Sequence, residues 1–141
     1  MENKKVTECL NSILEHELAG VVKYTHFAFM IFGHNRIPIC SWLRGQAKES
    51  LAHADQIGEH ITSLGGHPSL KIGKLLESNK HKINDILKES LEHEREQVEL
   101  YYELLELVKD ESVYLEEFAR SMISEEEMHI AEVEKMLKDP K

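Results

Sequence analysis

The sequence predicts an all-α protein, a bundle of four long helices in which two antiparallel hairpins are joined by one long crossover. The 141 residues include only seven glycines and three prolines, whereas Leu, Glu, Lys and Ala recur, and this composition favours helices over strands. Four long segments with helical apolar periodicity are separated by three connections, of which only the middle one is long. The length and the 41% of hydrophobic residues predict a single domain, residues 1–141, with a sizeable core.

The first two predicted helices form one hairpin. The first runs from about Lys4 to Phe32 and is ended by the segment GHNRIP, where Gly33 can adopt a left-handed conformation and Pro38 cannot continue a helix. The second begins near Pro38, a favoured first-turn residue, and ends at LGGHPS, residues 64–69. Because the connection is short, the two helices should be antiparallel neighbours.

The last two predicted helices form a second hairpin, from about Lys80 to Val108 and from the break KDES, residues 109–112, to about Lys138. The crossover, residues 65–79, should contain a short helical turn in IGKLLES, residues 72–78. Helices of about 28 residues are about 42 Å long, a distance that a mostly extended crossover can span. We therefore expect the second and third helices to run parallel.

A repeat relates the two hairpins. LEHELAGVVKY, residues 14–24, returns as LEHEREQVELY, residues 91–101, and Glu17 and Glu94 each begin the same E-x3-V-x2-Y pattern. The repeat suggests that the two halves of the chain are related by a pseudo-twofold axis.

Carboxylates and imidazoles interrupt the apolar stripe of every predicted helix at mid-length. The candidates for a metal site are Glu17, Glu49, His53, Glu94, Glu126 and His129. A single such residue is usually a boundary residue whose head group reaches water, but these occur at matched heights on all four helices. Buried carboxylates need a compensating cation, and no lysine or arginine lies on the stripes near them. Two metal ions, iron or manganese, suit this ligand set.

The other histidines lack such a partnership, and we expect most of them on the surface: His16, His26, His34, His67, His81 and His93. His60 is the exception, since it lies one heptad beyond His53 on the inward face. Cys9 and Cys40 form no CxxC motif and indicate neither a disulfide framework nor a thiolate zinc site.

Charge and hydropathy exclude further function classes. The formal net charge of −9 disfavours nonspecific binding to nucleic acid and to anionic membranes, because both are polyanions. The sequence contains no run of eighteen apolar residues and no apolar N-terminal segment after basic residues. We therefore expect a cytoplasmic protein without a membrane partner.

The chain resembles the bacterioferritin and ferritin-like di-iron family over nearly its whole length. The resemblance rests on LNSILEHELAGVVKY, ESLAHADQIGEHITSLGGHP, SLEHEREQVELY and EEEMHIAEV. It implies a ferritin-like four-helix bundle with a dinuclear iron centre that oxidises Fe(II) with O2 or H2O2. It further implies terminal ligands at Glu17, His53, Glu94 and His129 and a bridging carboxylate at Glu126. Tyr24 and Tyr101 would either hydrogen-bond to this ligand shell or serve only as core residues.

The sequence departs from the family pattern in three places. Ser50 stands three residues before His53, where the family has glutamate, so Glu49 is the candidate for the second bridge. Leu51 replaces the methionine that ligates haem in haem-binding bacterioferritins, so haem at that site is not expected. Only twelve residues follow His129, too few for the family's short C-terminal fifth helix.

Three functions compete on these grounds. The leading one is a ferroxidase for iron storage or detoxification, acting as a homo-oligomer that is at least a dimer, with a cage left open. The second is a rubrerythrin-like di-iron peroxidase, which would need a separate reductase because this chain has no CxxC pairs. The third is a helical assembly module without metal, which the serine at position 50 favours.

Overall fold

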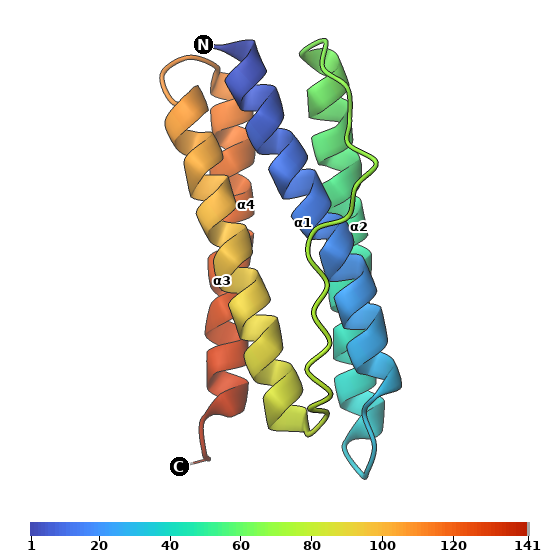
Figure 1. Ribbon diagram of the computed structural model, residues 1–141. Coiled ribbons are helices and arrows are strands. Elements are labelled where there is room, and N and C mark those ends of the chain that lie inside the picture. Colours follow the sequence, from blue (N-terminus) through green and yellow to red (C-terminus); the bar gives the residue numbers. More distant parts are fainter. Residues whose placement is uncertain (141) are drawn as a thin grey trace.

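The computed structural model describes residues 1–140, which form four α-helices and no strand (Figure 1). The helices are α1 Asn3–Phe29, α2 Arg36–Ser63, α3 Ile83–Val108 and α4 Val113–Leu137. The all-α prediction is therefore confirmed. No fifth helix follows α4 in the described residues. Among residues 1–140, no helix combines the length and the apolar character needed to cross a membrane.

The helix directions agree with the predicted topology. In Figure 1, α2 and α3 both run toward the end of the bundle where the N-terminus lies, and α1 and α4 run the opposite way. The helices of each hairpin pack against each other, and the two hairpins meet along α1 and α3. The arrangement is thus two antiparallel hairpins with a parallel α2–α3 pair.

The helix α1 ends at Phe29, before the predicted boundary at Phe32. The guanidinium of Arg36 donates hydrogen bonds to the carbonyl oxygens of Ala28 at 3.2 Å and Ile31 at 2.7 Å, which satisfies backbone acceptors at the end of the helix. Gly33 has a φ of 101° and turns the chain toward α2. The arginine is a capping group that the sequence pattern did not reveal.

The prediction of a helical turn in residues 72–78 is wrong, because residues 66–81 contain no helix. The Asn11 side chain donates to the carbonyl of His67 at 3.1 Å and accepts from the amide of Ser69 at 2.8 Å. The amide of Gly73 donates to the carbonyl of Glu15 at 2.8 Å. These contacts hold the crossover extended along α1. The amide of Gly73 bonds to α1 and so does not form the hydrogen bond within the crossover that a helix would need.

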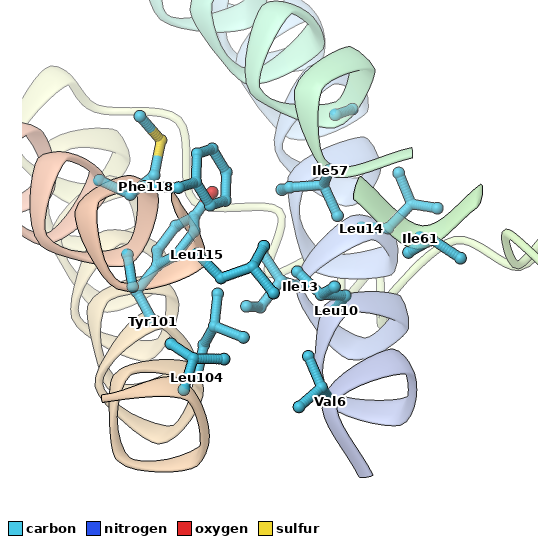
Figure 2. Close-up of a cluster of buried hydrophobic side chains, with 14 residues drawn as sticks. Val6, Leu10, Ile13, Leu14, Ile57, Ile61, Tyr101, Leu104, Leu115 and Phe118 are labelled. Atoms are coloured by element: carbon cyan, nitrogen blue, oxygen red, sulfur yellow. The ribbon is translucent and has the colours of Figure 1, made fainter. Parts of the chain in front are cut away.

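An apolar cluster spans both hairpins at the N-terminal end of α1 (Figure 2). Its labelled members come from all four helices: Val6, Leu10, Ile13, Leu14, Ile57, Ile61, Tyr101, Leu104, Leu115 and Phe118. Complete burial of an aliphatic side chain contributes about 1.5–3 kcal/mol. This cluster therefore contributes substantially to holding the hairpins together.

Two smaller apolar clusters fill the opposite end of the bundle. One lies mainly between α1 and α2 and includes Tyr24, Phe27 and Leu43, and the other lies between α3 and α4 and includes Leu87 and Val133. On each helix a buried glutamate or histidine lies between residues of these clusters and residues of the N-terminal cluster: Glu17 on α1, His53 on α2, Glu94 on α3 and Glu126 on α4. The fold thus places a polar layer between two apolar ends.

Candidate metal centre

Five polar side chains from the four helices form the buried layer at the middle of the bundle. Their exposed fractions are 2% for Glu17, 4% for His53, 4% for Glu94, 2% for Glu126 and 9% for His129. Each lies on the inward stripe that 3.6-residue periodicity assigns to its helix. The structure therefore places five of the six residues that the sequence analysis selected in one buried layer, and the sixth, Glu49, lies beside its histidines.

The carboxylate of Glu126 lies between two similar half-sites. In the first, His53 Nδ1 lies 2.7 Å from Glu17 Oε2 and 3.8 Å from Glu126 Oε1. In the second, His129 Nδ1 lies 4.0 Å from Glu94 Oε2 and 3.9 Å from Glu126 Oε2. Within each half-site the donor atoms all lie within 4.8 Å of one another. One carboxylate thus presents an oxygen to each of two histidine–glutamate pairs.

This layer lacks a protein cation to balance its charge. Within residues 1–140, the ion-pair partners of Glu17, Glu94 and Glu126 are histidines, never lysine or arginine. Glu126 Oε2 and His129 Nδ1 are shielded from solvent and have no hydrogen-bond partner. Unpaired buried polar atoms are costly, so these two atoms fit a bound cation.

Burial changes the protonation of the inner carboxyl groups. Burial and the adjacent Glu94 raise the pKa of Glu126 well above its usual range. Burial also raises the pKa of Glu17, and the opposing hydrogen bond with His53 does not cancel this effect. Without a metal ion, protons occupy part of the site, and a cation must displace them to bind.

Two tyrosines bind the inner carboxylates across the hairpins. Tyr24 on α1 donates its hydroxyl hydrogen to Glu94 on α3, and Tyr101 on α3 donates to Glu17 Oε2 on α1 at 3.1 Å. Burial and nearby carboxylates raise the pKa of both hydroxyls, so the tyrosines remain protonated donors. Of the two roles considered for these residues, hydrogen bonding to the site is confirmed.

Replacing Tyr101 with phenylalanine is expected to weaken metal binding at the first half-site about 10-fold, because Glu17 loses the donor that orients it. Isothermal titration with Co(II) measures this change. Tyr102→Phe is the matched control, since Tyr102 is exposed and its hydroxyl donates to Oε1 of the surface residue Glu127 at 3.4 Å, outside the central layer. Equal affinities for the two variants would show that Tyr101 does not orient the ligand.

A second pair of carboxylates lies on the outer edge of the two imidazoles. Glu125 Oε2 is 2.8 Å from His53 Nε2, and Glu49 is 3.8 Å from the same nitrogen and 3.2 Å from His129 Nε2. Both glutamates are partly exposed. The structure thus places Glu49 beside the histidines, on the edge opposite the inner carboxylates.

Glu125 was missed by the sequence analysis, although its spacing could have revealed it. It precedes His129 by four residues, as Glu49 precedes His53, and each glutamate contacts the histidine of the other helix. Burial lowers the pKa of His53, but Glu17, Glu125 and Glu49 outweigh this effect and raise it to about 9.

The prediction that His93 lies on the surface is wrong. Its side chain is 3% exposed and stacks on His16 with the ring centroids 4.0 Å apart. A Cβ atom on Gly20 would lie 2.8 Å from His93 Nε2 and 3.0 Å from Ser50 Oγ, so only glycine leaves room for both. His93 is buried because α1 lacks a side chain where α3 approaches it. Ser50 lies in this same region and is also buried.

Comparison with known proteins places these features in a family context. A family model described as a ferritin-like domain matches residues 7–141. No curated protein sequence matches the chain closely enough to count as a relative. The helix order and the carboxylate–histidine groups fit a di-iron site of the ferritin-like type.

Solved structures with similar folds cover almost the whole chain. A ferritin-like, diiron-carboxylate protein from Bacillus anthracis str. Ames has a TM-score of 0.92 and 23% identity, with 98% of this chain and 100% of that chain covered. A dodecameric thioferritin, the bacterioferritin-related protein of Bacteroides fragilis, has a TM-score of 0.87 and 21% identity. The match covers 97% of this chain and 86% of that chain. The bacterioferritin of Rhodobacter capsulatus has a TM-score of 0.82 and 25% identity, with the same coverages.

Proposed function

The chain belongs to the ferritin-like domain family, and we propose that it is a ferroxidase that binds two iron ions in its central layer and oxidises Fe(II) to Fe(III). One observation carries this proposal. Glu126 offers one oxygen to each of two glutamate–histidine pairs, and its Oε2 atom and His129 Nδ1 lack any other partner. Such a set of carboxylates and imidazoles suits Fe(II), and it also suits Mn(II).

In this proposal each half-site holds one ion. Glu17 and His53 bind one ion, Glu94 and His129 bind the other, and Glu126 binds both. Two Fe(II) ions together supply two electrons, which with two protons convert O2 to H2O2 or H2O2 to two water molecules. Tyr24 and Tyr101 orient the terminal carboxylates, and the apolar clusters on both sides limit access of water to the site.

We assign Glu49 and Glu125 to the outer side of the centre. They hold the Nε2 edges of His53 and His129 and so fix the direction in which Nδ1 points inward. Because both are partly exposed, they also offer carboxylate ligands to Fe(II) that arrives from solvent. Glu49 thus remains a metal ligand in the proposal, on the outer edge and not as a second inner bridge.

The proposal includes self-association into a homo-oligomer that is at least a dimer. Large apolar side chains are exposed near the turn between α1 and α2, among them Phe29, Phe32 and Ile37. The Bacteroides fragilis relative is dodecameric. Light scattering of the purified protein measures the mass, and a monomer at every concentration would refute this part of the proposal.

Metal analysis and rapid kinetics test the function. Protein purified from cells supplied with iron should contain about two irons per chain. After reconstitution with Fe(II), stopped-flow absorbance should detect oxidation by O2 or H2O2. Oxidation by H2O2 alone, with no reaction with O2, would favour the rubrerythrin-like peroxidase. Absence of bound metal would favour the metal-free assembly module.

A further inference from the structure

A second group of metal-ligating side chains lies on the outside of the bundle. It joins three segments of the chain: His26 on α1, Glu77 in the crossover and His81 just before α3. His26 Nε2 lies 2.6 Å from Glu77 Oε2, and His81 Nε2 lies 3.4 Å from Glu77 Oε1. His26 is nine residues after Glu17 on α1, about 14 Å along the helix axis, so this group is separate from the central layer.

The two imidazole nitrogens are shielded from solvent although their side chains are partly exposed. Neither Nε2 atom makes a hydrogen bond of acceptable geometry, despite the short distances to Glu77. The two rings are inclined at 68°, with centroids 6.0 Å apart, so the nitrogens approach the carboxylate from different directions. Shielded nitrogens close to a carboxylate, without a hydrogen bond, are the arrangement expected where lone pairs converge on a cation.

The carboxylate of Glu77 is fixed in place by the local backbone. The amide of Asn79 donates to Glu77 Oε1 at 2.7 Å, and Asn79 has a φ of 58°, a conformation that asparagine tolerates better than most residues. In the described residues, Glu77 has no lysine or arginine as an ion-pair partner.

We propose that His26, Glu77 and His81 bind a divalent transition-metal ion at a second, mononuclear site. Two imidazoles and one carboxylate form a ligand set typical of Zn(II) and Fe(II), and three protein ligands leave coordination positions open to water. His26 and Glu77 both line a surface pocket of about 180 Å³.

An ion at this site would hold the C-terminal part of the crossover, from residue 74 onward, against α1. The first half is already tied to α1 by the hydrogen bonds of Asn11 and by the contact of Gly73 with Glu15. Between Gly73 and the start of α3, Glu77 and His81 both contact His26 on α1. The bound ion therefore connects α1, the crossover and the start of α3.

Zinc binding to the intact chain tests the proposal. Equilibrium dialysis against Zn(II), followed by elemental analysis, should show that His26→Gln and His81→Gln each bind one equivalent less than wild type, with the affinity of that site lowered at least about 100-fold. His34→Gln is the matched control, since His34 is an exposed histidine in the turn after α1 and belongs to neither metal group. The readout is the loss of one equivalent, so it is valid whatever the central layer binds.

Hydrogen exchange provides a second readout that is independent of the proposed ferroxidase function. Zn(II) should slow amide exchange in residues 74–82 of the wild-type protein at least about 10-fold, and should have no such effect in His26→Gln. Full zinc stoichiometry in both histidine variants would overturn the proposal. Unchanged exchange in residues 74–82 of the wild type at saturating zinc would also overturn it.

Discussion

Replacing Glu126 with glutamine is expected to slow Fe(II) oxidation at least about 100-fold, because Glu126 is the one carboxylate that faces both half-sites. The same substitution should stabilise the metal-free protein by about 1–4 kcal/mol, since it removes a buried acid from a crowded group of carboxylates. Stopped-flow oxidation measures the first effect, and urea unfolding of chelator-treated protein measures the second. Opposite signs for activity and stability distinguish a ligand from a structural core residue.

Glu127→Gln is the matched control for this substitution, because Glu127 is exposed on the next position of α4. It should leave oxidation and stability close to wild type. Glu94→Ala should reduce oxidation as strongly as Glu126→Gln, since Glu94 is the terminal carboxylate of the second half-site. If both Glu94→Ala and Glu126→Gln oxidise Fe(II) at the wild-type rate, the central layer is not the reaction site.

The metal-free protein should lose several kcal/mol of stability as the pH rises from 6.5 to 9. The folded state raises the pKa values of Glu17 and Glu126, and it raises that of His53 from 6.5 to about 9. A group with a raised pKa stabilises the fold below its unfolded-state pKa and loses that contribution as the pH rises through the folded-state value. All three shifts have the same sign, and those of His53 and Glu126 span this window. Each proton that the folded state retains and the unfolded state releases lowers the free energy of unfolding by up to about 1.4 kcal/mol per pH unit.

The titration of His93 changes the stability in the opposite direction, and it does so below pH 6.5. Burial, with His16 and Lys23 nearby, lowers the pKa of His93 to about 2, so its contribution is complete above pH 6.5 and is lost as the pH falls below it. Urea unfolding of chelator-treated protein at pH 6.5, 7.5 and 8.5 isolates the groups of the central layer. A flat or rising free energy of unfolding over this range would contradict the prediction.

Two controls connect this pH dependence to the metal site. Glu126→Gln should make the slope shallower, since one of the titrating groups is gone. Saturating Mn(II) should restore stability at pH 8.5, because the ion takes the place of the protons that the site otherwise retains.

The sequence predicted the fold and the inner donor group because both depend on periodic patterns. The repeated Glu17 and Glu94 motifs and the spacing of Glu126 and His129 place polar residues on inward stripes, and packing then brings those stripes together. Helix register is a local property of each segment, so it can be derived without knowledge of the neighbouring helices.

The errors in the sequence analysis occurred where contacts between segments override local patterns. The crossover is extended because Gly73 donates to a carbonyl of α1, an acceptor that the local sequence does not reveal. His93 is buried because Gly20 on another helix leaves space for it. Glu125 was missed because it contacts a histidine on a different helix, and a single-helix stripe assigns it to the boundary.

The crossed hydrogen bonds of Tyr24 and Tyr101 also affect the order of folding. Each hairpin contains mostly local contacts and can form early, but alone it lacks the hydroxyl donor for its own glutamate, which the other hairpin supplies. Docking of the hairpins buries and pairs these groups in one step, so the central layer should be completed last. The second hairpin alone carries Glu94, Glu126 and His129, so a half-folded chain has at most one of the two half-sites, and only docking of the two halves completes the centre.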